Sequence, residues 1–485
     1  MFHQTTVAPS FTGPNHHRVF SLHWMSFKLL VAGLLVGGSC TLRADLDLLP
    51  PGYSIKLVSS NVTATSISQL AFKPGELTRV YAARSSPSRV SRYDFDPVNG
   101  LLSNEFTVAT NVDNREMIGL GFHSTNLYVT FDYGGSRTIR PGDGRLSRFM
   151  HADSNGVFRA RHDFVYGLNK GDHDLNQIQI LGDSLYLGIG GVGRVGNPMQ
   201  ENIYSMTIAR IVDLNQIVSN TNQIGANFKG PINYLASPSE WTNTAGADGQ
   251  LRYFASGFRN PFGICFDPQG KLWVSVNGNS DVGFLSDDLV YRDVTLGSQG
   301  DFPPPAWGYT NYITGTPIVP FINLGLSPSP TGFDFIRFGP DAGKIIMGEA
   351  GATQIASNGR DLLLIDATTG NWQQIYQFTT NVPVSTITDV VSDAFGRLFI
   401  TDYSRNNIWR LTPPLPTPAL TAALTDEGLR LSWPLFGVEY QLEESAELPP
   451  NANWHPSAAS IQTNLADIAA TLSVTNGSRY FRLRK

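Results

Sequence analysis

The sequence predicts an all-β protein in which a large repeat domain is followed by a small second domain. Glycine and proline are plentiful, with 47 and 30 residues of 485, while only 15% of the residues are charged. This composition is typical of chains with many strands and turns, and unlike that of helical bundles. The chain is too long for one ordinary hydrophobic core. Its formal net charge of -5 gives no electrostatic reason to expect binding to nucleic acid or to an anionic membrane.

Residues 1–44 have the features of an export signal. Lys28 precedes the apolar run Leu29–Val36, and Leu42-Arg43-Ala44 offers a cleavage site after Ala44. The run is roughly 10 residues long, short of the ~20 needed to span a bilayer, and no other segment resembles a membrane span. The segment before Met25 is polar, so Met25 is a candidate for the true start. We therefore expect an exported protein, periplasmic or extracellular; a buried N-terminal helix is the alternative interpretation.

The chain has two cysteines, Cys40 and Cys265. Cys40 follows the apolar run and permits lipidation, although Gly37 stands where a lipoprotein signal has an aliphatic residue. If the signal is removed after Ala44, Cys265 remains alone and no internal disulfide can form. The stability of the mature chain must then come from packing.

The repeat domain is clearest in residues 255–279, where two strand patterns flank a tight turn. Residues 263–266 are a short apolar run, and residues 271–276 alternate apolar and polar side chains. Between them, Asp267-Pro268-Gln269-Gly270 predicts a turn, since proline presets φ and glycine accepts a positive φ. Such a hairpin brings residues 259–261 and 277–279 to one edge of a sheet. A guanidinium, an amide and loop carbonyls at this edge could form a ligand site.

An apolar run, a turn and a second apolar strand recur along the chain at uneven spacings. The six copies lie at residues 70–82, 120–129, 178–187, 264–274, 335–347 and 390–400. Repeats at such periods indicate a propeller or an array, and each is long enough for a four-stranded blade. We therefore predict a six-bladed β-propeller over residues 45–411. A large β-sandwich or two stacked sheets is the alternative.

A proline-rich linker, residues 412–418, separates the repeat domain from a small C-terminal domain. In residues 419–485, Leu429–Trp433 and Tyr440–Glu443 alternate apolar and polar side chains, and Tyr480–Lys485 is another strand candidate. This pattern predicts a small β-sandwich, similar to modules that end many exported bacterial proteins. Sorting, attachment, carbohydrate contact and a plain spacer all remain open as its role.

Two stretches contain residues that could carry chemistry. Asp172-His173 precedes the third repeat, and a carboxylate beside a histidine can orient it as a general base. Residues 277–288 are rich in carbonyl and carboxylate oxygens, which suit Ca²⁺, although the spacing is not that of an EF-hand. The sequence has no HExxH or CxxC metal motif, no phosphate-binding loop, no dinucleotide fingerprint and no GxSxG elbow.

These stretches together resemble the soluble quinoprotein glucose and sorbosone dehydrogenases over roughly residues 50–410. The resemblance rests on Asp172-His173, on Gly257–Pro261 with the hairpin after it, on Met117–His123, and on Ala306–Tyr309. It is most specific in Arg259-Asn260-Pro261. Members of this family are six-bladed propellers that bind pyrroloquinoline quinone and Ca²⁺ on one face and oxidise sugars.

The resemblance implies a role for each matching residue. His173 would take the proton of a sugar or alcohol hydroxyl while hydride passes to the quinone, and Asp172 would orient His173. Arg259 and Asn260 would contact the quinone carbonyls. The backbone carbonyls of Gly278 and Asn279 would bind Ca²⁺, a Lewis acid toward the quinone. An external electron acceptor would complete the cycle.

The sequence departs from the family where the quinone carboxylates are held. Sugar-oxidising members use a lysine in the fifth blade and two arginines at the start of the sixth, but here residues 347–352 contain no lysine and Thr386 and Thr388 replace the arginines. Glu349 and Asp389 would even repel a tricarboxylate, and each charge-assisted bond that is lost contributes about 1.5–3 kcal/mol. Arg360 or Arg405 could substitute.

The loop after Gly278 departs from the family as well. Asn279 stands in place of the usual proline, and the acidic pair Asp287-Asp288 is displaced by several residues. The residues that maintain the blades are therefore kept better than those that hold the cofactor.

Two hypotheses about function follow. The first is a dehydrogenase for a sugar or alcohol that depends on pyrroloquinoline quinone and Ca²⁺. The second is a non-catalytic propeller that binds a saccharide or a protein and whose quinone site is degraded. A hydrolytic or lyase propeller is a third and weaker alternative.

Overall fold

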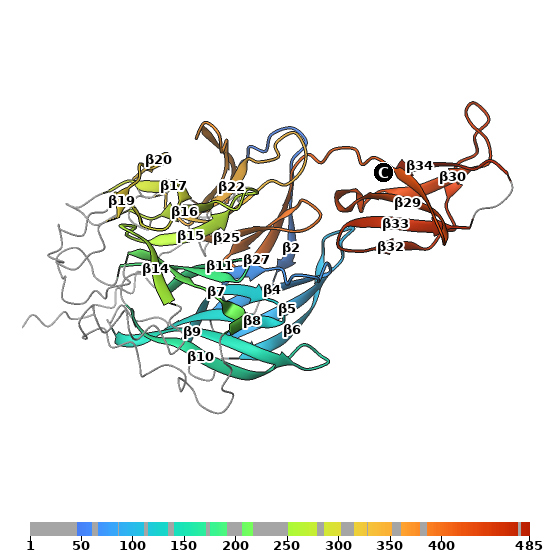
Figure 1. The fold of residues 1–485 in the computed structure, drawn as a ribbon. Coiled ribbons are helices and arrows are strands. Elements are labelled where there is room, and N and C mark those ends of the chain that lie inside the picture. The colour runs from blue at the N-terminus through green and yellow to red at the C-terminus, as the bar shows by residue number, and fades with distance from the viewer. Residues whose placement is uncertain are drawn as a thin grey trace, which may run out of the picture. The chain divides into compact units, whose positions relative to one another are not determined.

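The structure is a computed structural model, and it describes most of the chain after residue 45. The described residues are 46–60, 66–85, 87–110, 115–133, 140–170, 175–191, 206–216, 251–278, 286–301, 315–326, 328–351, 360–378, 386–473 and 477–485. They form strands and short 3-10 turns but no α-helix, which confirms the all-β prediction (Figure 1). No helix in these ranges could therefore cross a membrane. The predicted signal, residues 1–44, lies outside them.

Six sheets make up the larger domain, and each contains an antiparallel meander of three or four consecutive strands (Figure 1). Sheet 1 contains β3 (Ile67–Ala71), β4 (Arg79–Ser85), β5 (Ser88–Phe95) and β6 (Leu102–Thr110). Sheet 2 contains β7 (Arg115–His123), β8 (Asn126–Tyr133), β9 (Arg140–Ala152) and β10 (Phe158–Lys170). Sheet 3 contains β11 (Leu175–Leu181), β12 (Ser184–Ile189), β13 (Thr207–Ile211) and β14 (Leu251–Ser256), with β18 (Ser298–Gln299) and β19 (Thr316–Pro317) added at its edge.

The other three sheets follow the same plan. Sheet 4 contains β15 (Pro261–Phe266), β16 (Leu272–Val276), β17 (Asp288–Val294) and β20 (Ile322–Gly325). Sheet 5 contains β21 (Pro330–Phe335), β22 (Ile345–Glu349), β23 (Asp361–Ile365) and β24 (Trp372–Gln377), with β1 (Leu46–Asp47) at its edge. Sheet 6 contains β25 (Ile387–Ser392), β26 (Leu398–Asp402), β27 (Asn407–Thr412) and β2 (Ser54–Ser60).

The six sheets form a closed ring around their first strands. Strands β3, β7, β11, β15, β21 and β25 contact one another in that order, and β25 in turn contacts β3. Strand β2 pairs with β27, with Ser54 opposite Thr412, so that sheet 6 is built from both ends of the domain. This pairing stabilises the ring because opening it would expose two strand edges.

A side-chain hydrogen bond links every neighbouring pair of sheets. Leu120 N donates to Gln69 Oε1 between sheets 2 and 1 (2.7 Å), Thr130 Oγ1 to Asn176 O between sheets 2 and 3 (3.4 Å), and Asn176 Nδ2 to Pro261 O between sheets 3 and 4 (3.2 Å). Ser275 Oγ donates to Thr331 O between sheets 4 and 5 (2.8 Å), Ser392 N to Asp334 Oδ2 between sheets 6 and 5 (2.7 Å), and Leu70 N to Asp389 Oδ2 between sheets 1 and 6 (2.8 Å). The ring is therefore held by polar contacts as well as by packing.

Each first strand has a register shift near its beginning. The shifts lie at Ile67/Gln69, Met117/Leu120, Leu175/Ile178, Pro261/Ile264, Pro330/Phe333 and Ile387/Asp389. Such a bulge bends the strand and re-aims the side chains beside it. The residues that follow are polar in sheets 1, 3 and 6 (Gln69, Gln177, Asp389) and glycine in sheets 2, 4 and 5 (Gly119, Gly263, Gly332).

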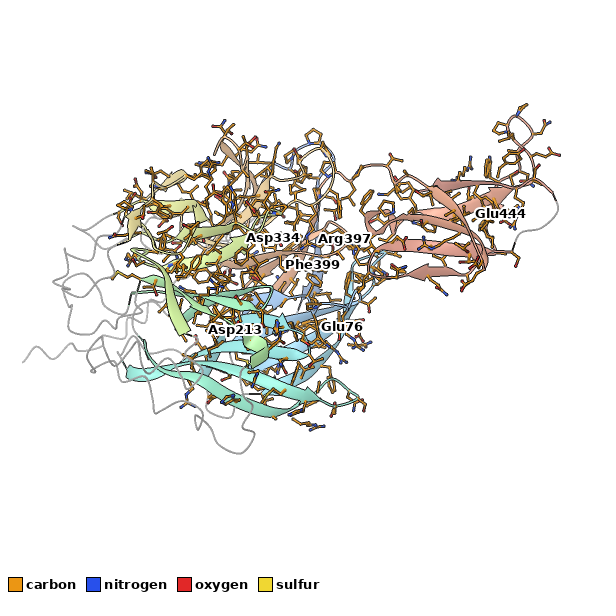
Figure 2. The ribbon with its side chains drawn as sticks, viewed as in Figure 1. Glu76, Asp213, Asp334, Arg397, Phe399 and Glu444 are labelled. Atoms are coloured by element: carbon orange, nitrogen blue, oxygen red, sulfur yellow. The ribbon has the colours of Figure 1, made fainter. Side chains whose placement is uncertain are left out.

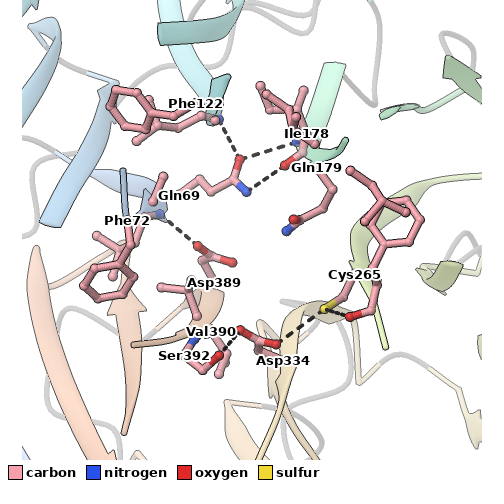
Figure 3. Close-up of a pocket in the computed structure, with 18 of the residues that line it drawn as sticks. Gln69, Phe72, Phe122, Ile178, Gln179, Cys265, Asp334, Asp389, Val390 and Ser392 are labelled. Atoms are coloured by element: carbon pink, nitrogen blue, oxygen red, sulfur yellow. Dashed lines mark hydrogen bonds between the residues drawn. The ribbon is translucent and has the colours of Figure 1, made fainter. Parts of the chain in front are cut away.

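Three of these side chains meet where the first strands converge, and two of them, Gln69 and Asp389, are labelled in Figure 3. Gln177 Nε2 donates to Asp389 Oδ1 at 2.8 Å, so sheets 3 and 6 are joined across the ring. Gln69 Nε2 donates to Ile178 O at 3.3 Å and joins sheets 1 and 3. We call Gln69, Gln177 and Asp389 the central plug. Gly332 lies against it: a Cβ there would be 2.4 Å from Asp389 Oδ1 and 2.6 Å from Gln177 Nε2.

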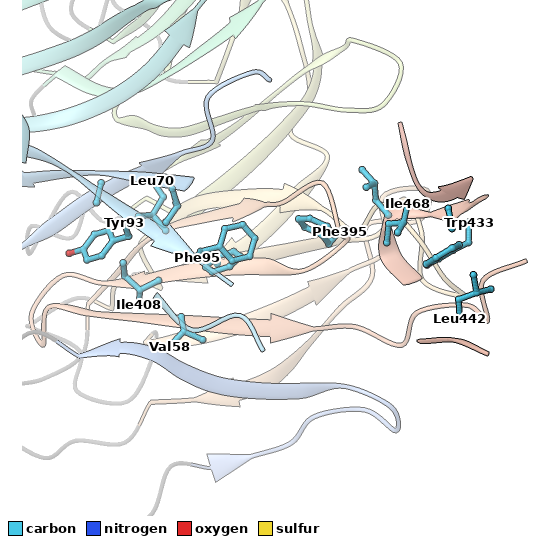
Figure 4. Packing of buried hydrophobic residues seen from close by; sticks show 14 of the residues in the cluster. Val58, Leu70, Tyr93, Phe95, Phe395, Ile408, Trp433, Leu442 and Ile468 are labelled. Atoms are coloured by element: carbon cyan, nitrogen blue, oxygen red, sulfur yellow. The ribbon is translucent and has the colours of Figure 1, made fainter. Parts of the chain in front are cut away.

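Sheet 6 also contains a buried ion pair in the turn after its first strand (Figure 2). Arg397 is 1% exposed, and its Nε donates to Asp393 Oδ2 at 2.9 Å. The guanidinium lies 4.8 Å from the centre of the Phe395 ring, a cation–π distance. Phe95, Phe395, Ile408 and Val58 are buried in the same part of the domain (Figure 4).

The C-terminal domain has two sheets. One contains β28 (Thr421–Thr425), β29 (Gly428–Pro434), β33 (Asp467–Leu472) and β32 (Ile461–Thr463); the other contains β31 (His455–Pro456), β30 (Gln441–Ser445) and β34 (Tyr480–Arg484). Trp433 and Ile468 of the first sheet and Leu442 of the second are buried together (Figure 4). The strands expected near Leu429, Tyr440 and Tyr480 are confirmed.

Five of the six predicted hairpins match the observed strands, and the copy at residues 335–347 is displaced. Its first strand, β21, ends at Phe335, so residues 336–338 belong to the turn rather than to the strand. Gly339 and Gly343 have φ of 91° and 88°, and Gly343 N donates to Ile336 O at 2.8 Å. The apolar residues of this turn produced a strand-like pattern without strand geometry.

We predict that Gly332→Ala destabilises the protein by roughly 1–3 kcal/mol, because a methyl group there overlaps the central plug. Gly121→Ala is the matched control, since its Cβ would be 3.3 Å from the flexible end of Ile180. The free energy of unfolding of both variants, measured with denaturant, tests this. Equal stability of the two variants would contradict the tight plug.

We also predict that the plug loses stability as pH rises. Burial raises the pKa of Asp389 from 3.8 to about 7. The hydrogen bonds from Leu70 and Gln177 lower this pKa, but burial has the larger effect. A carboxyl whose pKa is raised by folding stabilises most below its unfolded pKa, and this contribution is lost as pH rises through the folded pKa. The stability of the wild type relative to Asp389→Asn should therefore fall between pH ~4 and ~7, by up to about 1.4 kcal/mol per pH unit. A constant difference over this range would contradict the prediction.

Candidate functional site

One face of the ring carries the residues at which the first strands begin and the second strands end. Arg259 and Asn260 directly precede β15, Gly278 follows β16, and Glu349 ends β22. We call this the Arg259 face. The opposite ends of the first strands surround a cavity that is described below.

The β15–β16 hairpin positions Arg259 and Asn260 as the sequence predicted. Asp267 Oδ1 accepts hydrogen bonds from Gln269 N and Lys271 N, both at 2.9 Å, and Gly270 has a φ of 78°. At the open end, Pro261 pairs with Val276 and Asn277 N donates to Asn260 O at 3.0 Å. The two segments therefore meet at one sheet edge.

Arg259 is only 8% exposed, and it holds the loop that follows β16. Its Nη1 donates to Gly278 O and lies 3.4 Å from Asn277 O, while Gly278 N donates to Asp288 Oδ1 at 2.5 Å. The backbone is tight here, since a Cβ on Gly278 would be 2.2 Å from Ser286 O. The Gly278 carbonyl, a predicted Ca²⁺ ligand, thus faces a guanidinium.

Asn260 joins sheets 3 and 4. Its Oδ1 accepts a hydrogen bond from Asn176 Nδ2 at 2.8 Å, and Asn260 is 4% exposed. Asn176 therefore belongs to the site through Asn260. Sequence reasoning missed this role, although Asn176 lies three residues after His173 in the Gly171–Asn176 stretch.

Three buried carboxyl groups lie at the same face, on sheets 4 and 5. Asp288 begins β17, Glu349 ends β22 and Asp361 begins β23; their side chains are 2%, 4% and 7% exposed. Asp288 accepts hydrogen bonds from Gly278 N and, at 2.7 Å, from Ser329 N. Among the described residues, no hydrogen bond reaches the Glu349 carboxyl, and Asp361 Oδ1 and Asn277 Oδ1 are buried without a partner. Sequence reasoning missed Asp361. The only sign of it in the sequence is that an acidic residue stands immediately before the apolar run 362–365.

Burial raises the pKa of all three carboxyl groups. The pKa of Asp288 rises to about 6 despite the hydrogen bonds and the nearby Arg259, and that of Asp361 also rises to about 6. The pKa of Glu349 lies well above its usual value, first because of burial and then because Asp361 and Asp288 carry like charges. Asp361 and Asp288 therefore lie close enough to Glu349 to disfavour its charge.

The described residues do not fit a tricarboxylate quinone. Thr388 Oγ1 donates to Ile67 O at 3.0 Å and Thr386 Oγ1 bonds Ser404 Oγ at 2.7 Å, so both threonines have structural partners. Arg405 lies 3.9 Å from the Asp402 carboxylate, and Arg360 acts on Asp361. A ligand with three carboxylates would therefore meet three carboxyls of the protein at this face.

The structure corrects the expectation for Asp389. It was expected to repel the quinone, but it lies in the central plug and accepts hydrogen bonds from Leu70 N and Gln177 Nε2, both at 2.8 Å. Asp172, His173, Asn279 and the Ala306–Tyr309 segment lie outside the described residues, so their predicted roles remain predictions.

Comparison with solved structures of known proteins shows which proteins have a similar fold. No protein-family model and no curated protein matches the sequence. Among solved structures, the chain is similar to the holo form of the pyranose dehydrogenase PQQ domain from Coprinopsis cinerea, with a TM-score of 0.53 and 13% identity over 75% of this chain and 96% of that one. It is also similar to the iodide structure of a Trichoderma reesei carbohydrate-active enzyme of family AA12, with a TM-score of 0.54 and 14% identity over 79% of this chain and 100% of that one.

The calcium structure of the Trichoderma reesei protein gives the same TM-score of 0.54, at 14% identity. At such identities the likeness concerns the fold. The chain has the fold of the PQQ-dependent sugar dehydrogenases, and the resemblance inferred from its sequence is confirmed at that level.

Proposed function

We propose that this exported protein binds a saccharide at the Arg259 face of a six-bladed β-propeller, which a linker joins to a C-terminal β-sandwich. The observation that carries the proposal is the surplus of buried acceptor groups on that face. Asp361 Oδ1 and Asn277 Oδ1 are buried and have no donor among the described residues. Buried acceptors need partners, so a ligand rich in donors is favoured.

A saccharide meets this need because each hydroxyl group both donates and accepts. Its hydroxyls can donate to the carboxyl and amide oxygens of sheets 4 and 5, and its oxygens can accept from Arg259. A neutral ligand also adds no charge to a face where Asp361 and Asp288 already disfavour the charge of Glu349. Carbonyl and carboxylate groups, which a quinone would bring, are acceptors and leave the acceptors of the protein unpaired.

A quinone-dependent sugar or alcohol dehydrogenase is the second candidate. It is supported by the contact of Arg259 with the Gly278 loop, by the Asp172-His173 sequence and by the likeness to sugar dehydrogenase folds. Both candidates use a sugar at the same face, and they differ in whether the quinone, Ca²⁺ and an external acceptor take part. Reduction of a dye by sugar in the presence of added quinone and Ca²⁺ would favour the second.

We predict that the protein binds a mono- or oligosaccharide without added quinone or metal, and that Asn277→Ala weakens binding by about tenfold, the effect of one buried hydrogen bond. Isothermal titration with the sugars selected on a glycan array measures this. Asn371→Ala is the matched control, since Asn371 is an exposed amide in the β23–β24 turn. Absence of binding at millimolar sugar, or equal weakening in the two variants, would contradict the proposal.

A further inference from the structure

The ring has a cavity of about 290 Å³ at the ends of the first strands opposite the Arg259 face (Figure 3). All six sheets contribute to its lining, from the last residues of β3, β7, β11, β15, β21 and β25. We infer that this cavity binds a small organic carboxylate with an apolar body, with its carboxylate at Arg337.

The central plug forms the floor of the cavity. Gln69 and Asp389 line it, and the hydrogen bonds from Gln177 to Asp389 and from Gln69 to Ile178 O close the ring between the two faces. The cavity is therefore separate from the saccharide site proposed above. Its occupancy does not depend on that proposal.

Most residues of the lining have apolar side chains, although polar atoms make up the larger part of the surface that faces the cavity. The apolar residues include Leu70, Phe72, Leu120, Phe122, Ile178, Ile180, Phe266 and Val390. Covering an apolar ligand body with such side chains is favourable, at roughly 25 cal/mol per Å² of apolar surface removed from water. The volume is at the lower end of ligand pockets, so it suits a body of about ten non-hydrogen atoms.

Two polar side chains of the lining have unused hydrogen-bonding capacity. Neither the exposed Arg337 nor the half-buried Gln179 has a side-chain hydrogen bond or ion pair within the described part of the chain. Figure 3 shows the Gln179 amide pointing into the space between Asp389 and Cys265. By contrast, Asp334 is fully engaged: its Oδ2 accepts from Ser392 N at 2.7 Å and Ser392 Oγ at 2.6 Å, and its Oδ1 accepts from Phe335 N at 2.7 Å.

A carboxylate matches this arrangement. A guanidinium and an amide N–H are donors, and the guanidinium fork pairs with a carboxylate through two parallel hydrogen bonds. Of the two acidic residues of the lining, Asp389 opposes an anion only weakly at lower pH, because burial raises its pKa to about 7. Asp334 opposes an anion more strongly, since its charge contributes to the raised pKa of Asp389 and of Cys265, and this favours a carboxylate at Arg337 rather than beside Asp334.

The test uses hexanoate and benzoate as probes, with hexanol and benzamide as neutral counterparts. We expect the acids, but not the neutral compounds, to bind saturably when they are titrated into the full chain at pH 6 and the heat is measured. Dissociation constants between about 10 µM and 1 mM are expected for ligands of this size.

Arg337→Gln should weaken binding of the acids by about tenfold or more, and Arg337→Lys should weaken it less. Lys56→Gln, an equal change of charge at an exposed position on β2, should leave it unchanged. Saccharide binding at the Arg259 face should be unaffected by Arg337→Gln. The inference is overturned if neither acid binds, if the neutral compounds bind equally well, or if Arg337→Gln binds the acids as the wild type does.

Discussion

The hydrogen bond between Asp389 and Gln177 is the contact on which the ring most depends, because it joins sheets that are not neighbours. It is possible only because every first strand has a register shift at the same level, which places a side chain or a glycine where the strands converge. Three sheets supply side chains there and three supply glycines. More than three side chains would not fit, as the distances around Gly332 show.

This plug divides the molecule into two faces with different chemistry, although the same six strands build both. On the Arg259 face, one buried guanidinium and three buried carboxyls surround a loop with unpaired acceptors. On the opposite side, a cavity lined largely by apolar side chains also contains Arg337 and Gln179, whose side chains have no hydrogen-bond partner among the described residues. An acceptor-rich face suits a ligand with hydroxyl groups, and a donor-bearing cavity suits a small acid. The two proposals therefore follow from one rule, that buried polar groups require complementary partners.

Much of the fold could be predicted from the sequence because its signals are local. Alternating strands with a proline–glycine turn between them predicted the β15–β16 hairpin, and the meeting of Arg259 with Gly278 followed from strand geometry alone. The roles of Asn176, Asp361 and Asp389 could not be predicted in this way. The role of each of these residues depends on a contact between different sheets or on burial at the ring axis. The neighbouring residues in the sequence do not reveal such contacts or such burial. Residues 336–338 were wrongly predicted to be part of a strand, because the apolar residues of this turn give a strand-like pattern in the sequence.

We propose that the described residues of the Arg259 face lack the charge pattern that a tricarboxylate quinone requires and suit a saccharide. The most direct measurement is a titration of the protein with pyrroloquinoline quinone and Ca²⁺, followed by absorbance and fluorescence. We predict no saturable binding at tens of micromolar quinone, while the sugar still binds. Saturable quinone binding that is lost in Arg259→Ala would contradict the claim and would make the protein a quinone-dependent dehydrogenase.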